Sequence, residues 1–450
     1  MKEVLKISIP AMLDSMVAVI ITSIDTRMIS VLGPEAISAV SFTTQPKMIV
    51  FAVFFALGAA TSIFVAQAYG REDAEEANAC FHTILRVTVL LSVSLGILTG
   101  VLARPIMHLC NHQADTVEMS VTFFRIIMVC MIFHSVSVII NSALRGIGKT
   151  KVTFFSSIAM GAVDIVMNYL LIEGRLGFPR LEVAGDAIAT VCGTFAACVF
   201  SICYLRRSDG FLHLKGVFTG RRLNVERVKQ IRNKAAGIVS ENILTRVGFL
   251  LSGIILSTLD SGQTAVYYVT MILLNYTFAI GDGLQTAALT LIGRSVGAKD
   301  LEHVRGYNRK CLLLGLILSA ALSGCYLLGA EWFYGRFFSD REAVALGVRF
   351  TYVAAVLTFL QILRLVNIGT MRGIGDVKAP MAVAIICVLI VNPGMSYLLT
   401  VMRSHGIWGI WQASMVSQSI WFLASFYMSE RDLRRADLCL PDEPAARGSQ

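Results

Sequence analysis

Residues 145–151 read Arg-Gly-Ile-Gly-Lys-Thr-Lys, and residues 372–378 read Arg-Gly-Ile-Gly-Asp-Val-Lys. The offset that carries Arg145 onto Arg372 also places residues 60–70, ATSIFVAQAYG, on residues 287–297, AALTLIGRSVG. Two separated matches that share one offset are hard to obtain by chance. They therefore predict a chain built from two homologous halves.

The composition of the chain places these halves in a membrane. Of the 450 residues, 55% are hydrophobic and only 15% are charged, whereas soluble domains carry roughly 25% charged residues. With a mean hydropathy of +0.68, the chain holds more apolar side chains than a globular core could bury, so lipid must cover the excess. We therefore predict an all-α polytopic membrane protein, because lipid offers no partner to unpaired backbone groups outside helices.

Twelve apolar segments have the length of a membrane span, for which about 20 residues are needed. They are residues 7–31, 37–69, 83–108, 117–143, 152–174, 183–205, 235–259, 263–295, 311–336, 344–370, 379–402 and 407–429. The second and eighth are the longest, so they are expected to tilt or to project beyond the lipid. Because the repeat offset contains six segments, an even number, both halves enter the membrane in the same sense. Parallel repeats of this kind are typical of secondary transporters, whose substrate sites lie between the halves.

Basic residues set the expected orientation and the domain boundaries. They are concentrated in residues 206–234 and in the turns near 145–151, 294–310 and 372–378. By the positive-inside rule these segments face the cytoplasm, as do both termini, across a plasma membrane. We expect an N-terminal lobe at 1–205, a basic cytoplasmic linker at 206–234, a C-terminal lobe at 235–435 and a disordered cytoplasmic tail at 436–450. The net charge of +9 follows from this loop bias and does not indicate a nucleic-acid partner.

Four short motifs stand in order along the chain. They are Ile24-Asp25-Thr26 with Val31-Leu32-Gly33, the small-residue run at 66–70 (AQAYG), the run at 164–172 (DIVMNYLLI) and the run at 184–190 (AGDAIAT). Together with the two Arg-Gly-Ile-Gly turns, they resemble bacterial members of the multidrug and toxin extrusion (MATE) family over about residues 5–430. The resemblance implies a V-shaped fold of two six-helix lobes. It also implies a monomeric antiporter, without a cofactor, that expels small organic cations or drugs in exchange for Na⁺ or H⁺.

One pair of residues departs from the family pattern. The family usually carries Asn at the position of Asp164 and Asp at the position of Asn168, and here the two are exchanged. A spacing of four residues keeps both on one helical face, so a carboxylate remains but moves by about 5.4 Å along the axis. Asp186 also stands where the family more often has a small residue. Both changes leave open whether the coupling ion is sodium or a proton.

Polar residues at membrane depth point to an ion site in the first lobe. A charge there costs at least about 2.5–3.5 kcal/mol, which makes each one a functional candidate. Asp25, Asp164, Asn168 and Thr190 lie roughly 8–14 Å below the expected outer loops at 1.5 Å per residue. Such oxygens suit a hard cation such as sodium, or a carboxylate pair that shares a proton. The alternative interpretation is ordinary hydrogen bonding between helices.

Four further charges are secondary candidates for binding substrate or cation. Glu241 and Arg364 are expected to meet in the inner half of the second lobe, either as a buried ion pair or with Glu241 as a substrate-binding carboxylate. Asp282 lies in the middle of its segment and is a candidate cation ligand. Asp14 is the repeat equivalent of Glu241, because these two positions are separated by the same offset as Arg145 and Arg372.

Three other residues receive structural interpretations. Arg27 and Lys47 are expected to extend to the outer surface, because long basic side chains carry their charge toward water. His134 is expected to be a hydrogen-bonded histidine between helices and not a proton carrier.

Two other functions compete with cation-coupled export of small organic compounds. A flippase for lipid-linked oligosaccharides, from a related branch of the superfamily, would need several basic residues inside the lobes to hold phosphates, whereas acids dominate the first lobe. A membrane-bound enzyme would need clustered His, Asp or Glu on loops at one interface, and the loops show neither these nor a nucleotide motif. No CxxC or Cys/His spacing indicates a metal site. The sequence therefore favours a secondary active antiporter that is not an enzyme.

Overall fold

The computed structural model describes residues 1–439, except 111–113, 208–209, 218–224, 257 and 404. Within this part of the chain the regular structure is entirely helical. Ten of its helices are long and apolar enough to cross a membrane, and a pair of helices bent by 49° supplies an eleventh span. The last helix, α15 (Ile407–Cys439), covers the twelfth predicted segment, 407–429, but is not among these candidate spans. The prediction of an all-α polytopic fold is confirmed.

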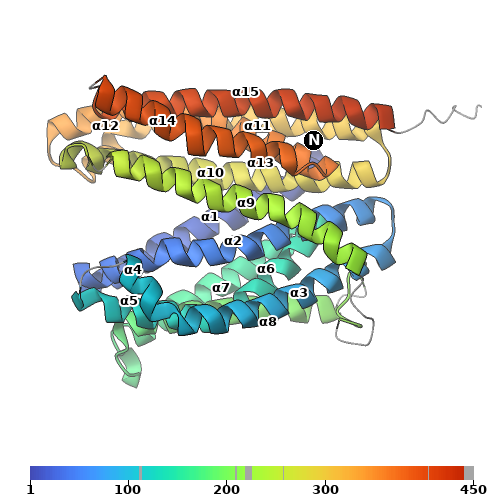
Figure 1. The fold of residues 1–450 in the computed structure, drawn as a ribbon, viewed down its shortest axis with the longest axis horizontal. Helices are drawn as coiled ribbons and strands as arrows, with labels where there is room; N and C mark the ends of the chain where they lie inside the picture. The colour runs from blue at the N-terminus through green and yellow to red at the C-terminus, as the bar shows by residue number, and fades with distance from the viewer. Residues whose placement is uncertain (111–113, 208–209, 218–224, 257, 404, 440–450) are drawn as a thin grey trace, which may run out of the picture.

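The first half of the chain forms the lower bundle in Figure 1. Its helices are α1 (Lys2–Ile29), α2 (Pro34–Gly70), α3 (Ala74–Val101), the short α4 (Ala103–Cys110), the bent pair α5 (Ala114–Val129) and α6 (Met131–Gly146), α7 (Thr150–Leu171) and α8 (Glu182–Arg207). A short 3₁₀ turn at Ser30–Leu32 lies between α1 and α2, and another at Arg175–Gly177 lies between α7 and α8.

The second half forms the upper bundle of the same view. It consists of α9 (Val225–Leu256), α10 (Ser261–Gly297), α11 (Leu301–Gly335), α12 (Arg341–Ile374), α13 (Lys378–Ala384), α14 (Asn392–Tyr397) and α15. Two π-helical stretches, Ile385–Val391 and Leu398–Met402, continue α13 and α14 into one long segment. The span predicted at 379–402 is therefore helical but not α-helical throughout.

The two halves repeat each other in local detail. The helices α2 and α10 both have 37 residues, which fits the two unusually long segments of the sequence. Each ends in a turn with one non-glycine residue at positive φ, Glu72 and Lys299, both at 58°. Each turn is followed by an aspartate, Asp73 or Asp300, whose side chain accepts a backbone N–H of the next helix and so satisfies one of its free amide groups.

Two expected boundaries lie elsewhere in the structure. The basic stretch 206–234 is not all linker, because α9 begins at Val225, and residues 208–209 and 218–224 lie outside the described part. The helix α15 continues to Cys439, beyond residue 436, where the tail was expected to begin. Residues 440–450 lie outside the described residues.

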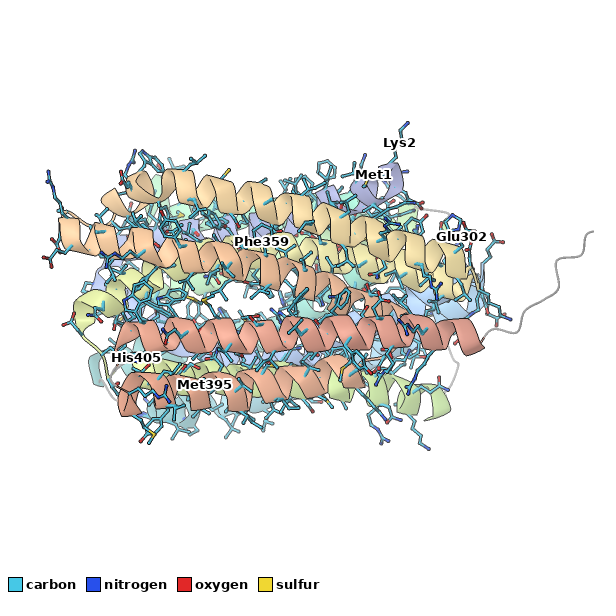
Figure 2. The ribbon with its side chains drawn as sticks, turned by 90° about the horizontal axis from the view of Figure 1, so that it is seen from above. Met1, Lys2, Glu302, Phe359, Met395 and His405 are labelled. Atoms are coloured by element: carbon cyan, nitrogen blue, oxygen red, sulfur yellow. The ribbon has the colours of Figure 1, made fainter. Side chains whose placement is uncertain are left out.

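The halves meet along α1 and α2 on one side and α9 and α10 on the other. Figure 2 places Met1 and Lys2 at the same end of the molecule as Glu302 near the start of α11, whereas His405 before α15 lies at the opposite end. The N-terminus and the turn after α10, both expected on one side of the membrane, therefore share one end of the bundle.

Candidate functional site

Three helices of the first half bring the predicted ion ligands together. Asn168 on α7 donates its side-chain N–H to Asp25 Oδ1 on α1 at 3.3 Å. One turn earlier on α7, the Asp164 carboxyl interacts with the side chains of Asp25 and of Thr190 on α8. Asp164 and Asn168 are buried, whereas Asp25 is only partly buried. The structure thus assembles all four residues predicted from their depth, although their binding of an ion stays a prediction.

Glycines on α8 make this assembly possible. A Cβ added to Gly193 would lie 2.8 Å from the carbonyl oxygen of Met160 and 3.0 Å from the Cβ of Asp164. A Cβ added to Gly185 would lie 2.7 Å from the carbonyl oxygen of Leu171. Real Cβ atoms do not approach this closely, so α8 packs against α7 at a distance that only glycine permits. This contact carries Thr190 and Asp186 to the polar side chains of α7.

Several oxygen atoms of the site have no hydrogen-bond partner. Among the described residues, Asp164 Oδ1, Asn168 Oδ1 and Asp186 Oδ1 are buried and accept no hydrogen bond. Buried acceptors are rarely left this way, because each loses its hydration without a replacement. The arrangement is suited to a proton donor or a small cation. In the described part of the chain, no three His, Cys, Asp or Glu side chains are grouped so that they could hold a metal ion together.

Two charged residues of this lobe were not predicted to belong to the site. Asp186 on α8 is only 3% exposed and interacts with Asn168 and with the charges of Asp25 and Lys47. Lys47 on α2, which was expected to extend to the outer surface, is only partly exposed and interacts with the charges of Asp186 and Asp25. That expectation was wrong, since its Nζ lies 5.6 Å from the centroid of the Phe123 ring inside the lobe. A lysine this far past Pro34, well inside a long apolar segment, was the signal for this in the sequence.

His134 is held by ring stacking. Its ring is nearly parallel to that of Phe51 at 4.6 Å and edge-on to Phe55 at 6.0 Å. Its Nε2 atom is buried without a hydrogen-bond partner in the described residues. The expectation of a hydrogen-bonded histidine is therefore not met at Nε2. Arg27, as expected, is exposed.

In the second half Glu241 has a different partner from the one predicted. It pairs with Arg372 at 2.8 Å, whereas the Arg364 guanidinium lies over the Trp421 ring, 3.6 Å from its centroid. The prediction of a Glu241–Arg364 contact was wrong because the two arginines, eight residues apart on α12, point about 80° apart around the helix at 3.6 residues per turn. Glu241 still acts on Arg364 through its charge.

Asp14 forms the equivalent pair in the first half. Arg145 donates to Asp14 Oδ2 at 2.6 Å, and the repeat offset carries both residues onto the Glu241 pair. Asp282 accepts a hydrogen bond from Ser15 at 3.0 Å, which joins α10 to α1. It lies beside the charge of Arg145, at the contact between the halves. Asp14 and Asp282 are therefore engaged with neighbouring residues.

A second, symmetric set of contacts joins the halves. Gln67 on α2 donates to the carbonyl oxygens of Gly373 and Ile374 at 3.1 and 3.3 Å. Its repeat equivalent, Arg294 on α10, donates to the carbonyl oxygen of Ile147. Each long helix thus binds the Arg-Gly-Ile-Gly turn of the opposite half.

The long helices cross at two equivalent glycines. A Cβ on Gly70 would overlap the carbonyl oxygen of Arg294, and a Cβ on Gly297 would overlap that of Gln67. The crossing lies where α2 and α10 end, near the start of α11. This is the end of the molecule that holds Met1 and Glu302 (Figure 2). The halves are therefore held together tightly at that end.

These features define a membrane transporter with two repeated helical lobes and a buried carboxylate site in one of them. The MatE family model matches residues 10–170 and 238–398. The chain belongs to the MatE family, and the two matched stretches confirm the internal repeat.

The chain is similar to several named relatives. It is 24% identical over 381 residues to the "Probable multidrug resistance protein YoeA" of Bacillus subtilis, covering 84% of this chain and 82% of the relative. It is 22% identical over 418 residues to the "Probable multidrug resistance protein NorM" of Thermotoga maritima, covering 91% and 88%. The chain also matches a solved structure, that of the outward-facing conformation of a multidrug resistance MATE family transporter of the MOP superfamily. The TM-score is 0.90 at 18% identity, and the match covers 97% of this chain and 96% of that chain. The predicted two-lobe fold is confirmed.

Proposed function

We propose that this protein is a secondary active antiporter that exports small organic compounds, often cationic and amphipathic, across the plasma membrane in exchange for Na⁺ or H⁺. The observation that carries the proposal is the assembly of Asp25, Asp164, Asn168 and Thr190 around buried oxygens without partners. Similar proteins named as multidrug resistance proteins support the substrate class. We further propose that it works as a monomer, without a cofactor, with the basic loops and both termini in the cytoplasm.

The chemistry of the site explains why ion binding would drive transport. Asp25 and Asp164 lie side by side, and two adjacent carboxylates in a low-dielectric environment repel each other when both are ionised. A proton shared between them, or a sodium ion coordinated by them and by Asn168 and Thr190, removes this repulsion. Binding therefore favours the lobe conformation in which the two carboxylates are closest, and release favours the other.

The flippase alternative needs free basic side chains inside the lobes. Arg145 and Arg372 are inside the bundle, but each is paired with an acid, Asp14 or Glu241. Within the described residues, Lys47 and Arg364 form no ion pair within 4.0 Å, but they lie over aromatic rings in opposite lobes and so do not form a basic cluster. The observations favour export of organic cations over binding of phosphates.

Purified protein in proteoliposomes with an imposed sodium or proton gradient tests the proposal, with ethidium as the transported dye. We expect ethidium movement to depend on one of the two gradients and to be lost in Asp25→Asn, because that variant removes a charge needed to bind the driving ion. Arg27→Gln is the matched control, since Arg27 lies on the same helix but is exposed. Ethidium movement that ignores both gradients, or an Asp25→Asn variant as active as the unchanged protein, would contradict the proposal.

A further inference from the structure

Lys47 is the basic side chain of the first-lobe site, and its surroundings are unusual for a lysine. Its ammonium group lies over the Phe123 ring of α5. The charged and titratable groups that it faces come from four helices: Asp186 on α8, Asp25 on α1, His134 on α6 and, beyond Asp25, Asp164 on α7. A lysine charge is thus placed inside the lobe whose carboxylates form the proposed ion site.

The ammonium faces the carboxylates without contacting them. In the described part of the chain, neither Asp186 nor Asp25 forms an ion pair with Lys47 within 4.0 Å, whereas Asp14 and Glu241 each form one with an arginine. Asp186 Oδ1 is buried and accepts no hydrogen bond from any described residue. The lobe therefore holds a positive and a negative group that act on each other through their charges but are not joined.

The flexible stem of a lysine allows this gap to close. Four methylene groups let the ammonium move by several ångströms without backbone motion. When a cation leaves the site, the buried carboxylates of Asp164 and Asp186 and the partly buried carboxylate of Asp25 lose its compensating charge, which is unfavourable where water is scarce. An ammonium group close by can neutralise part of that charge, because charge interactions are strong where water is scarce. A cation that enters the site must then displace it.

We infer that Lys47 is a tethered cation that competes with the driving ion for Asp186 and Asp25. The inference rests on the proposed antiport function and assigns to Lys47 and Asp186 the control of ion affinity and ion release. When the site is empty the ammonium approaches the two carboxylates. When Na⁺ or H⁺ binds, the ammonium withdraws toward the Phe123 ring, where the π-electrons stabilise it. Lys47 is a positioning residue, since it acts through the carboxylates and not on the exported compound.

Competition of this kind changes affinity and rate in opposite senses. Lys47→Met removes the competitor, so the driving ion should bind more tightly and leave more slowly. We expect the half-saturating ion concentration to fall by about tenfold, which is within the range typical of coupled sites, and the maximal rate of ethidium efflux to fall as well. Lys47→Arg keeps the charge and should stay close to the unchanged protein in both quantities. A lysine needed only for packing would not produce a tighter site.

The test is ethidium efflux from proteoliposomes, with sodium titrated at fixed pH and protons titrated without sodium. Lys310→Met is the matched control, because Lys310 also lies over an aromatic ring, that of Tyr307 at 5.5 Å, but far from the carboxylates in the other half. Thermal unfolding with and without NaCl gives a second measure of ion binding, and Lys47→Gln replaces Lys47→Met should the latter not fold. The inference about Lys47 would be overturned if the unchanged protein shows ion-driven efflux and Lys47→Met or Lys47→Gln has the same half-saturating ion concentration. That result would leave the proposed function standing. Absence of ion-driven efflux in the unchanged protein would instead contradict the proposed function.

Discussion

The Arg145 guanidinium donates to the Asp14 carboxylate at 2.6 Å, and at the equivalent positions of the second half Arg372 and Glu241 form the same pair at 2.8 Å. In each half the pair ties the first helix, α1 or α9, to the Arg-Gly-Ile-Gly turn. That turn is also the backbone segment bound by Arg294 or Gln67 from the opposite half. Each ion pair therefore fixes the position of a turn on which the contact between the halves depends.

Loss of the buried pair in the second half should destabilise the protein. In Glu241→Gln the Arg372 charge stays buried without compensation, so we expect the free energy of unfolding to fall by about 3–5 kcal/mol. Arg104→Gln is the control, since the Arg104–Glu118 pair is 61% and 63% exposed and should change it by about 0–1 kcal/mol. Chemical denaturation of the detergent-solubilised protein measures both. A Glu241→Gln variant that is fully stable but inactive in efflux would support Glu241 as a substrate-binding carboxylate instead.

The exchanged pair on α7 should act as one unit. Asp164→Asn removes the carboxylate beside Asp25 and should abolish ion-coupled efflux. Adding Asn168→Asp should restore a large part of it, because Asn168 already contacts Asp25 at 3.3 Å and its carboxylate would regain the lost ligand. The rescue would be non-additive, as expected for residues that share one site. Dye efflux from inverted vesicles across sodium concentrations and pH measures this, and unchanged coupling in Asp164→Asn would show that the pair serves only packing.

The glycine crossing between the halves should not tolerate a methyl group. In Gly297→Ala the new Cβ would overlap the Gln67 carbonyl oxygen, so α2 and α10 must move apart. We expect a loss of about 1–3 kcal/mol of stability from overpacking together with reduced efflux. Gly306→Ala is the control, because nothing lies within 4 Å of its added Cβ. If Gly297→Ala unfolds at the same temperature as the unchanged protein and transports equally well, the crossing is not a constraint.

The orientation of the chain can be tested by thiol labelling of intact cells. Cys110 lies at the end of α4 and should react with a membrane-impermeant maleimide, whereas Arg207→Cys in a Cys110→Ser background should react only after permeabilisation. Cys80 and Cys311 are buried, and the exposed Cys203 and Cys325 are replaced by Ser in both proteins. Partial burial raises the pKa of the Cys110 thiol, so it holds less reactive thiolate than an ordinary cysteine at pH 7. Its labelling should therefore accelerate as the pH rises from 7 to 9, and outside labelling of Arg207→Cys would overturn the orientation.

The repeat, the apolar segments and the depth of the polar residues all follow from the amino-acid sequence alone. Lipid permits only structures that satisfy their own backbone groups, so a long apolar run dictates a helix whatever its neighbours are. Depth then follows from counting residues along a helix of known rise. This is why Asp25, Asp164, Asn168 and Thr190 could be placed at one level, and why the structure brings them together.

The directions of the other charged side chains depend on how the helices pack against one another. Lys47 turns inward, Glu241 pairs with Arg372 and not with Arg364, and Asp282 binds Ser15 across the contact between the halves. In a soluble helix the polar face marks the side that meets water. In a membrane helix the lipid-facing side and the packed side are both apolar, so the sequence carries little information on rotation about the axis. Rotation is set by close packing at residues such as Gly193, against Met160 of the preceding helix, and Gly297, against Gln67 of the opposite half.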